Sequence, residues 1–233
     1  MKTIGLIGGM SWESSLEYYR LINEGVKERL GGLHSAQCLM YSVDFAPIEV
    51  MQQSGQWDAG AALMVDAAQR LERGGADFVL LCTNTMHKSA PQIEAAIKIP
   101  FLHIADAAGR RVQAAGLRRV GLLGTRFTME EDFYTGRLAR FGLETLIPPA
   151  AERREVNRVI YDELCLGITR PESRQAYREV IAGLAQAGAE AIILGCTEIG
   201  LLVKPEDSPL PLFDTTRIHA EAAVEMALEG TPG

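Results

Sequence analysis

The sequence has few cysteines and no long apolar stretch. Its four cysteines, Cys38, Cys82, Cys165 and Cys196, lie far apart and include no C-x-x-C pair. This spacing argues against a zinc site and against a disulfide framework in a chain of this size, so we expect free thiols and no metal. No apolar segment approaches the length needed to cross a bilayer, and that of the N-terminus is too short for a signal peptide. We therefore expect a cytoplasmic protein with no membrane partner.

Basic residues are fewer than acidic residues. The 233 residues include 23 basic and 30 acidic side chains, which gives a net charge of −7. There is no run of lysine and arginine interleaved with aromatic residues, of the kind that follows a nucleic-acid strand. The glycines near the N-terminus, Gly5, Gly8 and Gly9, lack the G-x-G-x-x-G spacing of a dinucleotide site. We therefore expect neither a nucleic-acid partner nor a bound dinucleotide.

What the chain does contain is an alternation of apolar strands with helical segments. A hydrophobic content of 47% is enough for a sizeable core. Strand, helix, strand alternation is typical of parallel α/β layers. In the first half we expect strands over 3–8, 35–43, 77–81 and 101–104, helices over 13–29, 57–73 and from about 90, and a loop over 45–53.

Two polar turns follow buried strands. Cys196, Thr197 and Glu198 follow the apolar run 191–194, and the segment 82–88 follows the apolar run 78–81. Open α/β sheets bind their ligands at this edge, beyond the carboxyl ends of the strands. We predict that the two turns form halves of one site.

The second half of the sequence repeats the first. Three segments of the first half, 5–9, 76–84 and 100–106, have counterparts at nearly constant offset in 121–125, 189–197 and 211–214. The alternative is that all α/β units look alike. The repeat predicts two similar Rossmann-like parallel-sheet domains related by pseudo-twofold symmetry, with the site in the cleft between them. We expect domains over 1–105 and 106–214, and a C-terminal helix over about 215–233 that packs on either half.

Two turns related in this way suit chemistry on both faces of one carbon. A racemase removes a proton from one face of its substrate and delivers a proton to the other, so it needs two acid/base groups. A cysteine suits the removal when a helix N-terminus or a cation lowers the pKa of its thiol, and Cys196 has the required position. Neither turn has a lysine placed for a Schiff base, nor a glycine loop that cradles phosphate. We expect chemistry without pyridoxal phosphate or another cofactor.

At this point the sequence resembles a known family, the cofactor-independent aspartate/glutamate racemases, and above all bacterial members that act on L-aspartate and L-glutamate or on a broad set of amino acids. The similarity covers essentially the whole chain. It rests on four motifs, which are Gly8-Gly9-Met10-Ser11-Trp12, Thr83-Asn84-Thr85-Met86-His87, Leu123-Gly124-Thr125 and Gly195-Cys196-Thr197-Glu198. The resemblance implies two Rossmann-like domains around an amino-acid substrate, with two cysteines that flank its Cα. It places the second of these at Cys196 and the first at Thr83.

Threonine at position 83 is a departure from the family pattern. Cys82 lies one residue earlier, and neighbouring side chains of an extended segment point to opposite faces, so Cys82 is expected to be a buried core residue. A threonine hydroxyl is too weak an acid to act as a ready base, but it can donate a proton to a carbanion. In related glutamate racemases the second cysteine deprotonates the L-isomer. The resemblance therefore assigns L-substrates to Cys196, with Thr83 on the opposite face.

The resemblance also supplies substrate-binding candidates. These are Met10, Gln52, Asn84, Thr85, Thr125, Thr128, Thr197 and Glu198. The threonines and Asn84 have an alternative role as helix caps, Met10 as a core residue, and Glu198 either as a first-turn carboxylate or as the group that orients Cys196. Gln52 stands where relatives often carry a basic residue, and a neutral amide weakens strict specificity for acidic substrates. His87 is either a direct participant or a helix-start residue.

Three functions remain open on the sequence. The first is an amino-acid racemase that uses Cys196 and Thr83 and works as a homodimer. The second is a single-cysteine decarboxylase or isomerase of the same superfamily, which the threonine at position 83 keeps open. The third is a non-catalytic metabolite-binding protein on the same scaffold.

Overall fold

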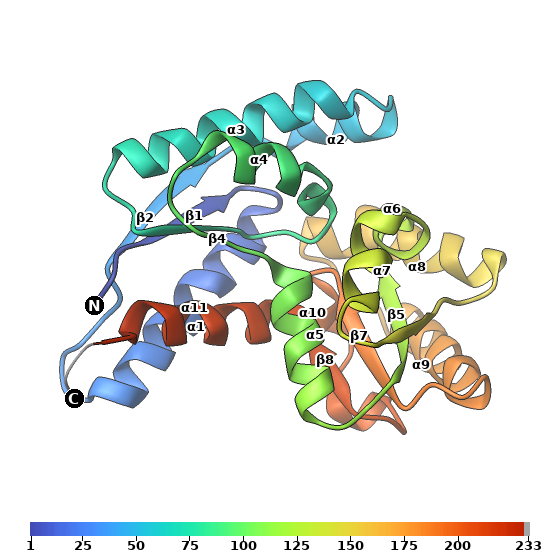
Figure 1. Cartoon of the computed structure of the whole chain (residues 1–233). Coiled ribbons are helices and arrows are strands. Elements are labelled where there is room, and N and C mark those ends of the chain that lie inside the picture. The colour runs from blue at the N-terminus through green and yellow to red at the C-terminus, as the bar shows by residue number, and fades with distance from the viewer. Residues whose placement is uncertain (231–233) are drawn as a thin grey trace. The chain divides into compact units, whose positions relative to one another are not determined.

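The computed structural model describes residues 1–230 and contains two separate four-stranded sheets, in which every pairing is parallel. Their orders are β2-β1-β3-β4 and β6-β5-β7-β8 (Figure 1). The strands are β1 Ile4–Gly8, β2 Cys38–Ser42, β3 Phe78–Leu81, β4 Phe101–Leu102, β5 Arg119–Gly124, β6 Glu144–Leu146, β7 Ala191–Gly195 and β8 Leu212–Asp214.

Helices follow the strands in sequence in both halves of the chain. The α-helices are α1 Trp12–Leu30, α2 Phe45–Gln53, α3 Trp57–Arg73, α4 Ala90–Ala96, α5 Ile104–Ala114, α6 Arg126–Glu130, α7 Asp132–Ala139, α8 Ala150–Asp162, α9 Pro171–Gln186, α10 Ile199–Leu202 and α11 Thr215–Leu228. The 3₁₀ helices are η1 Thr85–Ser89, η2 Leu164–Leu166 and η3 Pro205–Asp207. The two sheets share one strand order, which confirms the predicted α/β class with two similar parallel-sheet domains.

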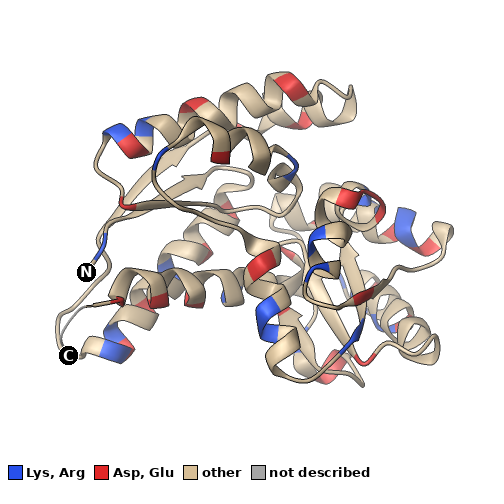
Figure 2. Ribbon diagram, in the orientation of Figure 1, with Lys and Arg blue, Asp and Glu red and all other residues tan. Residues whose placement is uncertain are grey.

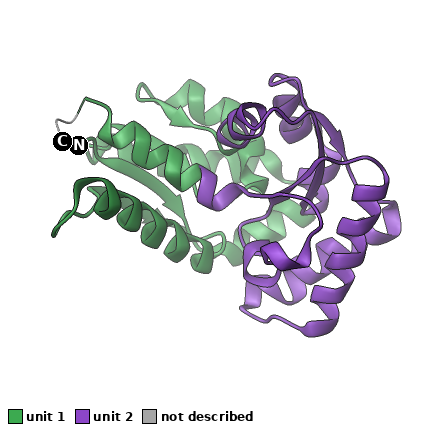
Figure 3. Cartoon of the chain, turned by 90° about the horizontal axis from the view of Figure 1, so that it is seen from below, with its two compact units in different colours: residues 1–104, 219–233 green, residues 105–218 purple. Residues whose placement is uncertain are grey.

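The chain divides into two compact units, which Figure 3 colours separately. Unit 1 comprises residues 1–104 and 219–230, and unit 2 comprises residues 105–218. The chain passes from one unit to the other at the start of α5 and again within α11. Of the C-terminal helix expected over 215–233, residues 231–233 lie outside the described part of the chain.

In unit 1 the sheet is covered on both faces. Successive side chains of a strand point to opposite faces, and in β3 Phe78 and Leu80 belong to one apolar cluster while Val79 and Leu81 belong to the other. Helices α1 and α11 supply the helical residues of the first cluster and α3 supplies most of those of the second, so the sheet lies between two helical layers (Figure 1). Every residue of β1 and β3 is buried, which explains the continuous apolar runs of the sequence.

In unit 2 the central strands are close-packed. Helices α6, α8 and α9 contact β5, and all residues of β7 are buried. Two glycines meet where these strands end, since Gly124 pairs with Gly195. A Cβ atom on Gly195 would lie 2.9 Å from the backbone oxygen of Leu123, and one on Gly124 would lie 2.7 Å from the oxygen of Gly195. The carboxyl ends of β5 and β7 therefore approach too closely for any side chain.

The segment 45–53 corrects one expectation. It was predicted as a loop, but it forms helix α2, and the side chain of Asp44 caps it by accepting a hydrogen bond from the backbone N–H of Ala46 at 3.2 Å. Pro47 lies in the first turn, where a proline costs the helix no hydrogen bond. Ile48 and Gln52 are the buried residues, one turn apart. A helix this short, with a proline in it, has too weak a periodicity to be recognised from the sequence.

Two strand boundaries also differ from those expected. Strand β2 begins at Cys38 and not at residue 35, and β4 ends at Leu102 because Ile104 already begins α5. None of the helices in residues 1–230 is long and apolar enough to cross a membrane. Figure 2 shows lysine and arginine interspersed with aspartate and glutamate along the helices.

Candidate active site

The thiol of Cys196 lies at the carboxyl end of β7 and is paired with an acid. Its Sγ donates a hydrogen bond to Glu198 Oε2 at 3.0 Å, and the hydroxyl of Thr197 donates to the same oxygen at 2.7 Å. Glu198 is 3% exposed and Cys196 8% exposed. This turn therefore holds a thiol and a hydroxyl on one buried carboxylate oxygen.

The protonation state of Cys196 differs from the expectation. A lowered pKa was predicted, but burial raises the pKa of the Cys196 thiol well above its ordinary value, and the negative charge of Glu198 raises it further. The main physical reason is burial, and the neighbour at hydrogen-bond distance is moreover a carboxylate and not a cation. The resting thiol is protonated, and Glu198 is the group placed to take its proton.

Thr125 and Thr128 lie at the adjoining strand end of unit 2. Thr125 follows β5 and caps α6, because its side chain accepts a hydrogen bond from the backbone N–H of Thr128 at 3.4 Å. The two hydroxyl oxygens are 3.3 Å apart. Thr128 is fully buried, and its methyl group lies against the spaces where side chains of Gly124 and Gly195 would be. Thr125 thus has the helix-capping role that was its alternative on the sequence. Thr128 is not the cap, and its side chain packs against the glycine pair.

The strand registers show which residues of the two turns occupy equivalent positions in the two sheets. In unit 1, Ile7 of β1 lies opposite Leu81 of β3, so the next residue, Gly8, lies level with Cys82. In unit 2, the corresponding Gly124 of β5 lies opposite Gly195 of β7. Cys82 therefore corresponds to Gly195, and Thr83 corresponds to Cys196. The strand registers within the two sheets therefore give the same correspondence of Thr83 with Cys196 as the sequence repeat.

Cys82 belongs to the core of unit 1. It is 0% exposed and lies in the same apolar cluster as Leu80, as strand alternation requires. Burial raises the pKa of its thiol far above the ordinary value. Cys82 therefore has the surroundings of a small apolar residue.

His87 holds the backbone of the Thr83 turn. Its Nδ1 lies 2.6 Å from the carbonyl oxygen of Thr83, and its Nε2 lies 3.2 Å from the backbone nitrogen of Ile104. A carbonyl only accepts and an N–H only donates, so Nδ1 carries the proton, Nε2 accepts, and the ring is neutral. This clamp between the turn and the start of α5 is a structural task for His87 that the sequence did not reveal. The one sequence feature consistent with it is the four-residue spacing between Thr83 and His87.

The remaining candidates of unit 1 are all buried. Thr83 is 8%, Asn84 2% and Thr85 5% exposed, and all three belong to the turn after β3. Gln52 is 3% exposed and lies in the last turn of α2. Met10 lies in the apolar cluster of α3, which is the core role that was its alternative.

A second network of unit 1 had no signal in the sequence. The Tyr18 hydroxyl lies 2.8 Å from His219 Nδ1, and His219 Nε2 lies 2.9 Å from the carbonyl oxygen of Leu102. These residues are far apart in the chain, so only the fold brings them together. They join α1, α11 and β4 within unit 1.

Comparison with known proteins identifies the family of this chain. The model of the Asp/Glu/hydantoin racemase family matches residues 7–223. The chain belongs to the Asp/Glu/hydantoin racemase family. A Yersinia pestis protein named provisionally as an Asp/Glu racemase is 54% identical, with a TM-score of 0.91 over 98% of this chain and 100% of that one. An aspartate racemase homologue from Pyrococcus horikoshii OT3 is 34% identical, with a TM-score of 0.84 over 97% and 99%.

A curated relative gives the same family from sequence. The broad-specificity amino-acid racemase of Bacillus subtilis (strain 168) is 25% identical over 168 residues, which is 71% of each chain. The predicted resemblance to the aspartate/glutamate racemases is therefore confirmed for the chain as a whole.

Proposed function

We propose that this protein is a cofactor-independent amino-acid racemase that inverts the α-carbon of aspartate, glutamate or a broader set of amino acids. Its family membership supports the reaction class. The observation that carries the proposal is the hydrogen bond from Cys196 Sγ to Glu198 Oε2 at 3.0 Å. A buried thiol beside a buried carboxylate is a nucleophile or base beside its own proton acceptor.

In the forward direction we assign the first proton transfers to unit 2. Glu198 takes the thiol proton of Cys196, and the thiolate then removes the α-proton of the L-amino acid, which leaves a planar carbanion. The raised pKa of the thiol makes it a strong base once its proton has left. The positively charged ammonium group of the substrate favours the thiolate form, because an opposite charge nearby lowers a thiol pKa.

Thr83 completes the inversion in this proposal. Its hydroxyl donates a proton to the opposite face of the carbanion and recovers one from solvent. Cys196 keeps the α-proton and Glu198 releases the thiol proton to solvent, so the D-amino acid forms with no net consumption of protons. The equivalent strand positions of Thr83 and Cys196 support the pairing. The hydroxyls of Thr85 and Thr125 and the backbone N–H of Thr197 receive the substrate carboxylate at the ends of parallel strands.

The substrate range follows from Gln52 in this proposal. The side chain of Gln52, which is buried in α2, is an amide with both donor and acceptor atoms, whereas a basic residue selects a carboxylate. We therefore expect acidic amino acids to be accepted without the exclusion of neutral ones of similar size.

A decarboxylase of malonate-like acids is the second candidate. The threonine at position 83 favours it, because decarboxylation needs only one protonating thiol. Cys196 has a thiol hydrogen-bonded to an acid, whereas Cys82 lies in an apolar cluster. This reaction releases carbon dioxide from an arylmalonate or alkylmalonate, whereas a racemase releases none.

The test is a panel of L-amino acids, with product separation by chiral chromatography and methylmalonate as the decarboxylase arm. We expect D-aspartate or D-glutamate to form and no carbon dioxide release. Cys196→Ser should abolish turnover, and Cys38→Ser, which removes a thiol elsewhere in the chain, should not. Decarboxylation without racemisation favours the second candidate. Neither reaction, in protein shown to be folded, supports a binding protein instead.

Assembly as a homodimer is part of the proposal. Trp12, Leu16 and Tyr19 are 64%, 60% and 51% exposed and lie at helical spacing on one side of α1. An exposed apolar stripe of this kind is typical of an interaction surface. Light scattering after size-exclusion chromatography should give twice the chain mass, and Leu16→Glu should reduce it to the chain mass.

A further inference from the structure

A hollow in unit 2 contains none of the residues predicted for the active site. It has a volume of about 440 Å³ and is bordered by α5, α10, η3, β8 and the start of α11. Small-molecule sites have volumes of roughly 300–1,000 Å³, so the hollow is large enough for a metabolite. Its apolar lining includes Val203, Leu212, Phe213 and Ile218.

Positive charge gathers in this hollow. Arg111, Lys204 and Arg217 line it together with a single carboxylate, Asp214. The chain as a whole has a net charge of −7, so a group of three cations with one acid runs against the overall balance. Such a local field attracts an anion with more than one negative charge.

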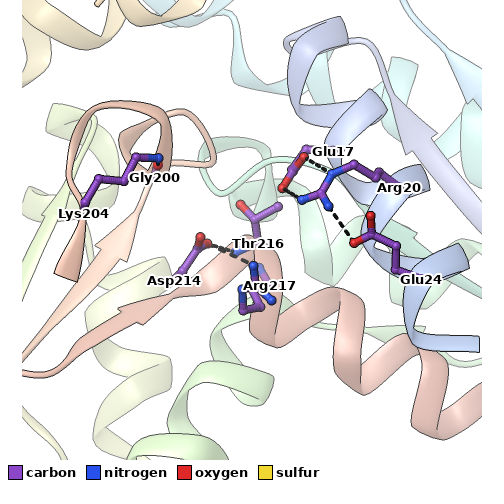
Figure 4. A network of polar contacts seen from close by, with 8 residues as sticks. All are labelled: Glu17, Arg20, Glu24, Gly200, Lys204, Asp214, Thr216 and Arg217. Carbon is purple, nitrogen blue, oxygen red and sulfur yellow. Dashed lines mark hydrogen bonds and ion pairs between the residues drawn. The ribbon is translucent and has the colours of Figure 1, made fainter. Parts of the chain in front are cut away.

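The single acid is engaged by the protein. Asp214 Oδ1 accepts hydrogen bonds from the backbone N–H groups of Thr216 at 2.9 Å and of Arg217 at 3.3 Å, at the start of α11 (Figure 4). Its other oxygen lies so close to Gly200 that a Cβ atom there would be 2.9 Å away. Asp214 is thus held at the wall of the hollow as a helix cap.

Lys204 and Arg217 retain donors for a ligand. Lys204 Nζ donates one hydrogen bond, to the carbonyl oxygen of Gly200 at 2.7 Å, and an ammonium group has three N–H donors (Figure 4). Within residues 1–230 the guanidinium of Arg217 makes no ion pair with a carboxylate, and its side chain is exposed. Arg20 of α1 shows the contrast, because Glu17 and Glu24 both pair with it at 2.6 Å (Figure 4).

We propose that this hollow is a binding site for a small organic dianion with an apolar body, either a phosphate monoester or a dicarboxylate. Arg217, Arg111 and Lys204 contact the anionic group, because guanidinium groups match the paired oxygens of phosphate and carboxylate. Phe213 and Val203 contact the apolar body. The hollow includes Ile218, the last residue of unit 2, so the ligand binds beside one of the two places where the chain passes between its units.

Isothermal titration calorimetry on the full chain tests the site with four probes. These are adenosine monophosphate, succinate, inorganic phosphate and uncharged adenosine. We expect saturable binding of adenosine monophosphate or succinate, and which of them binds identifies the anionic group. Inorganic phosphate should bind more weakly than adenosine monophosphate, and adenosine should not bind. The absence of saturable binding by both organic dianions at millimolar concentration overturns the proposal.

Two variants and a control locate the site. Arg217→Gln and Lys204→Gln should each weaken binding of the dianion by about tenfold or more. Arg140→Gln makes the same charge change on an exposed arginine of unit 2 outside the hollow, and it should leave binding unchanged. Equal weakening by all three variants, or none by the first two, overturns the assignment.

Amide hydrogen exchange gives a readout that does not depend on the variants. Bound dianion should slow exchange in 199–205 and 212–218 and leave the turn at 196–198 unaffected. Protection at 196–198 alone would place the anion at the proposed catalytic turn and refute a separate site. Because none of these measurements uses turnover, failure of the proposed racemase function does not affect them.

Discussion

Replacing Glu198 by glutamine separates two effects of one carboxylate. The substitution removes a negative charge 3.0 Å from Cys196 Sγ and leaves an amide of nearly the same shape. Loss of that charge should lower the pKa of the Cys196 thiol, because Glu198 contributes to raising it. The amide cannot accept the thiol proton, however, so proton removal from the substrate should slow. The variant should therefore have a more reactive thiol and a less active enzyme.

The size of the loss follows from the role of a positioned base. General-base catalysis contributes roughly 10²–10⁴-fold, and one decade corresponds to about 1.4 kcal/mol of barrier. Since the amide still holds the hydroxyl of Thr197 in place, we expect a decrease in kcat near the lower limit, about 10²-fold, with KM changed by less than threefold. A structural role alone would instead alter folding or KM.

Two assays check this pair of effects. Chiral chromatography gives kcat and KM for L-glutamate, and the rate of iodoacetamide alkylation against pH gives the thiol pKa in wild type and variant. Cys38→Ser removes one competing thiol from the alkylation measurement. A variant with full kcat, or with a thiol pKa above that of the wild type, would refute the assignment of Glu198 as the proton acceptor.

Further predictions concern stability and the first turn. Burial raises the pKa of Cys38 to about 11 and that of Cys82 further, so above the ordinary thiol pKa of about 8.5 the unfolded chain loses protons that the folded chain keeps. The free energy of unfolding should therefore fall from about pH 8.5 upward, by up to about 1.4 kcal/mol per pH unit for each group. Urea titrations at several pH values should show that this free energy falls less steeply with pH in Cys82→Ala than in the wild type. Gly195→Ala places a Cβ atom 2.9 Å from a backbone oxygen and should cost about 1–3 kcal/mol in urea unfolding, whereas Gly183→Ala, in the open interior of α9, should stabilise by about 0.5–1 kcal/mol. Equal effects at the two glycines would contradict the close approach of β5 and β7. Thr83→Cys should bring the kcat values for L- and D-glutamate closer together, while Cys82→Ser should change them little; loss of activity in Cys82→Ser alone would make Cys82 the catalytic residue of the first turn.

The fold was largely predictable because its central strands are buried on both faces. Strands such as β3 and β7 are short continuous apolar runs that end in turn residues, and the same order of elements occurs twice in the chain. Helix α2 escaped recognition because its nine residues contain a proline and only two buried positions. Local signals therefore sufficed for the sheets but not for the short helix.

The strand-end positions of Thr83 and Cys196 were predictable, but the electrostatics of Cys196 were not. Strand alternation placed Cys82 in the core and left Thr83 at the position equivalent to that of Cys196, and the registers within the two sheets give the same correspondence. The direction of the Cys196 pKa shift depends on burial and on where the Glu198 side chain turns, which the sequence does not encode locally. The hollow is lined by residues about a hundred positions apart in the chain, such as Arg111 and Arg217, so no local sequence motif predicted it.

Exchange of the α-proton in deuterated water tests the central claim most directly. If Cys196 removes the proton of L-glutamate and Thr83 returns one to the other face, Thr83→Ala should still exchange the α-proton of L-glutamate for deuterium while D-glutamate forms far more slowly. In Cys196→Ser both exchange and inversion of L-glutamate should be lost. Mass spectrometry and chiral chromatography on the same samples measure the two rates. Undiminished inversion in Thr83→Ala, or α-proton exchange of L-glutamate at the wild-type rate in Cys196→Ser, would contradict the account.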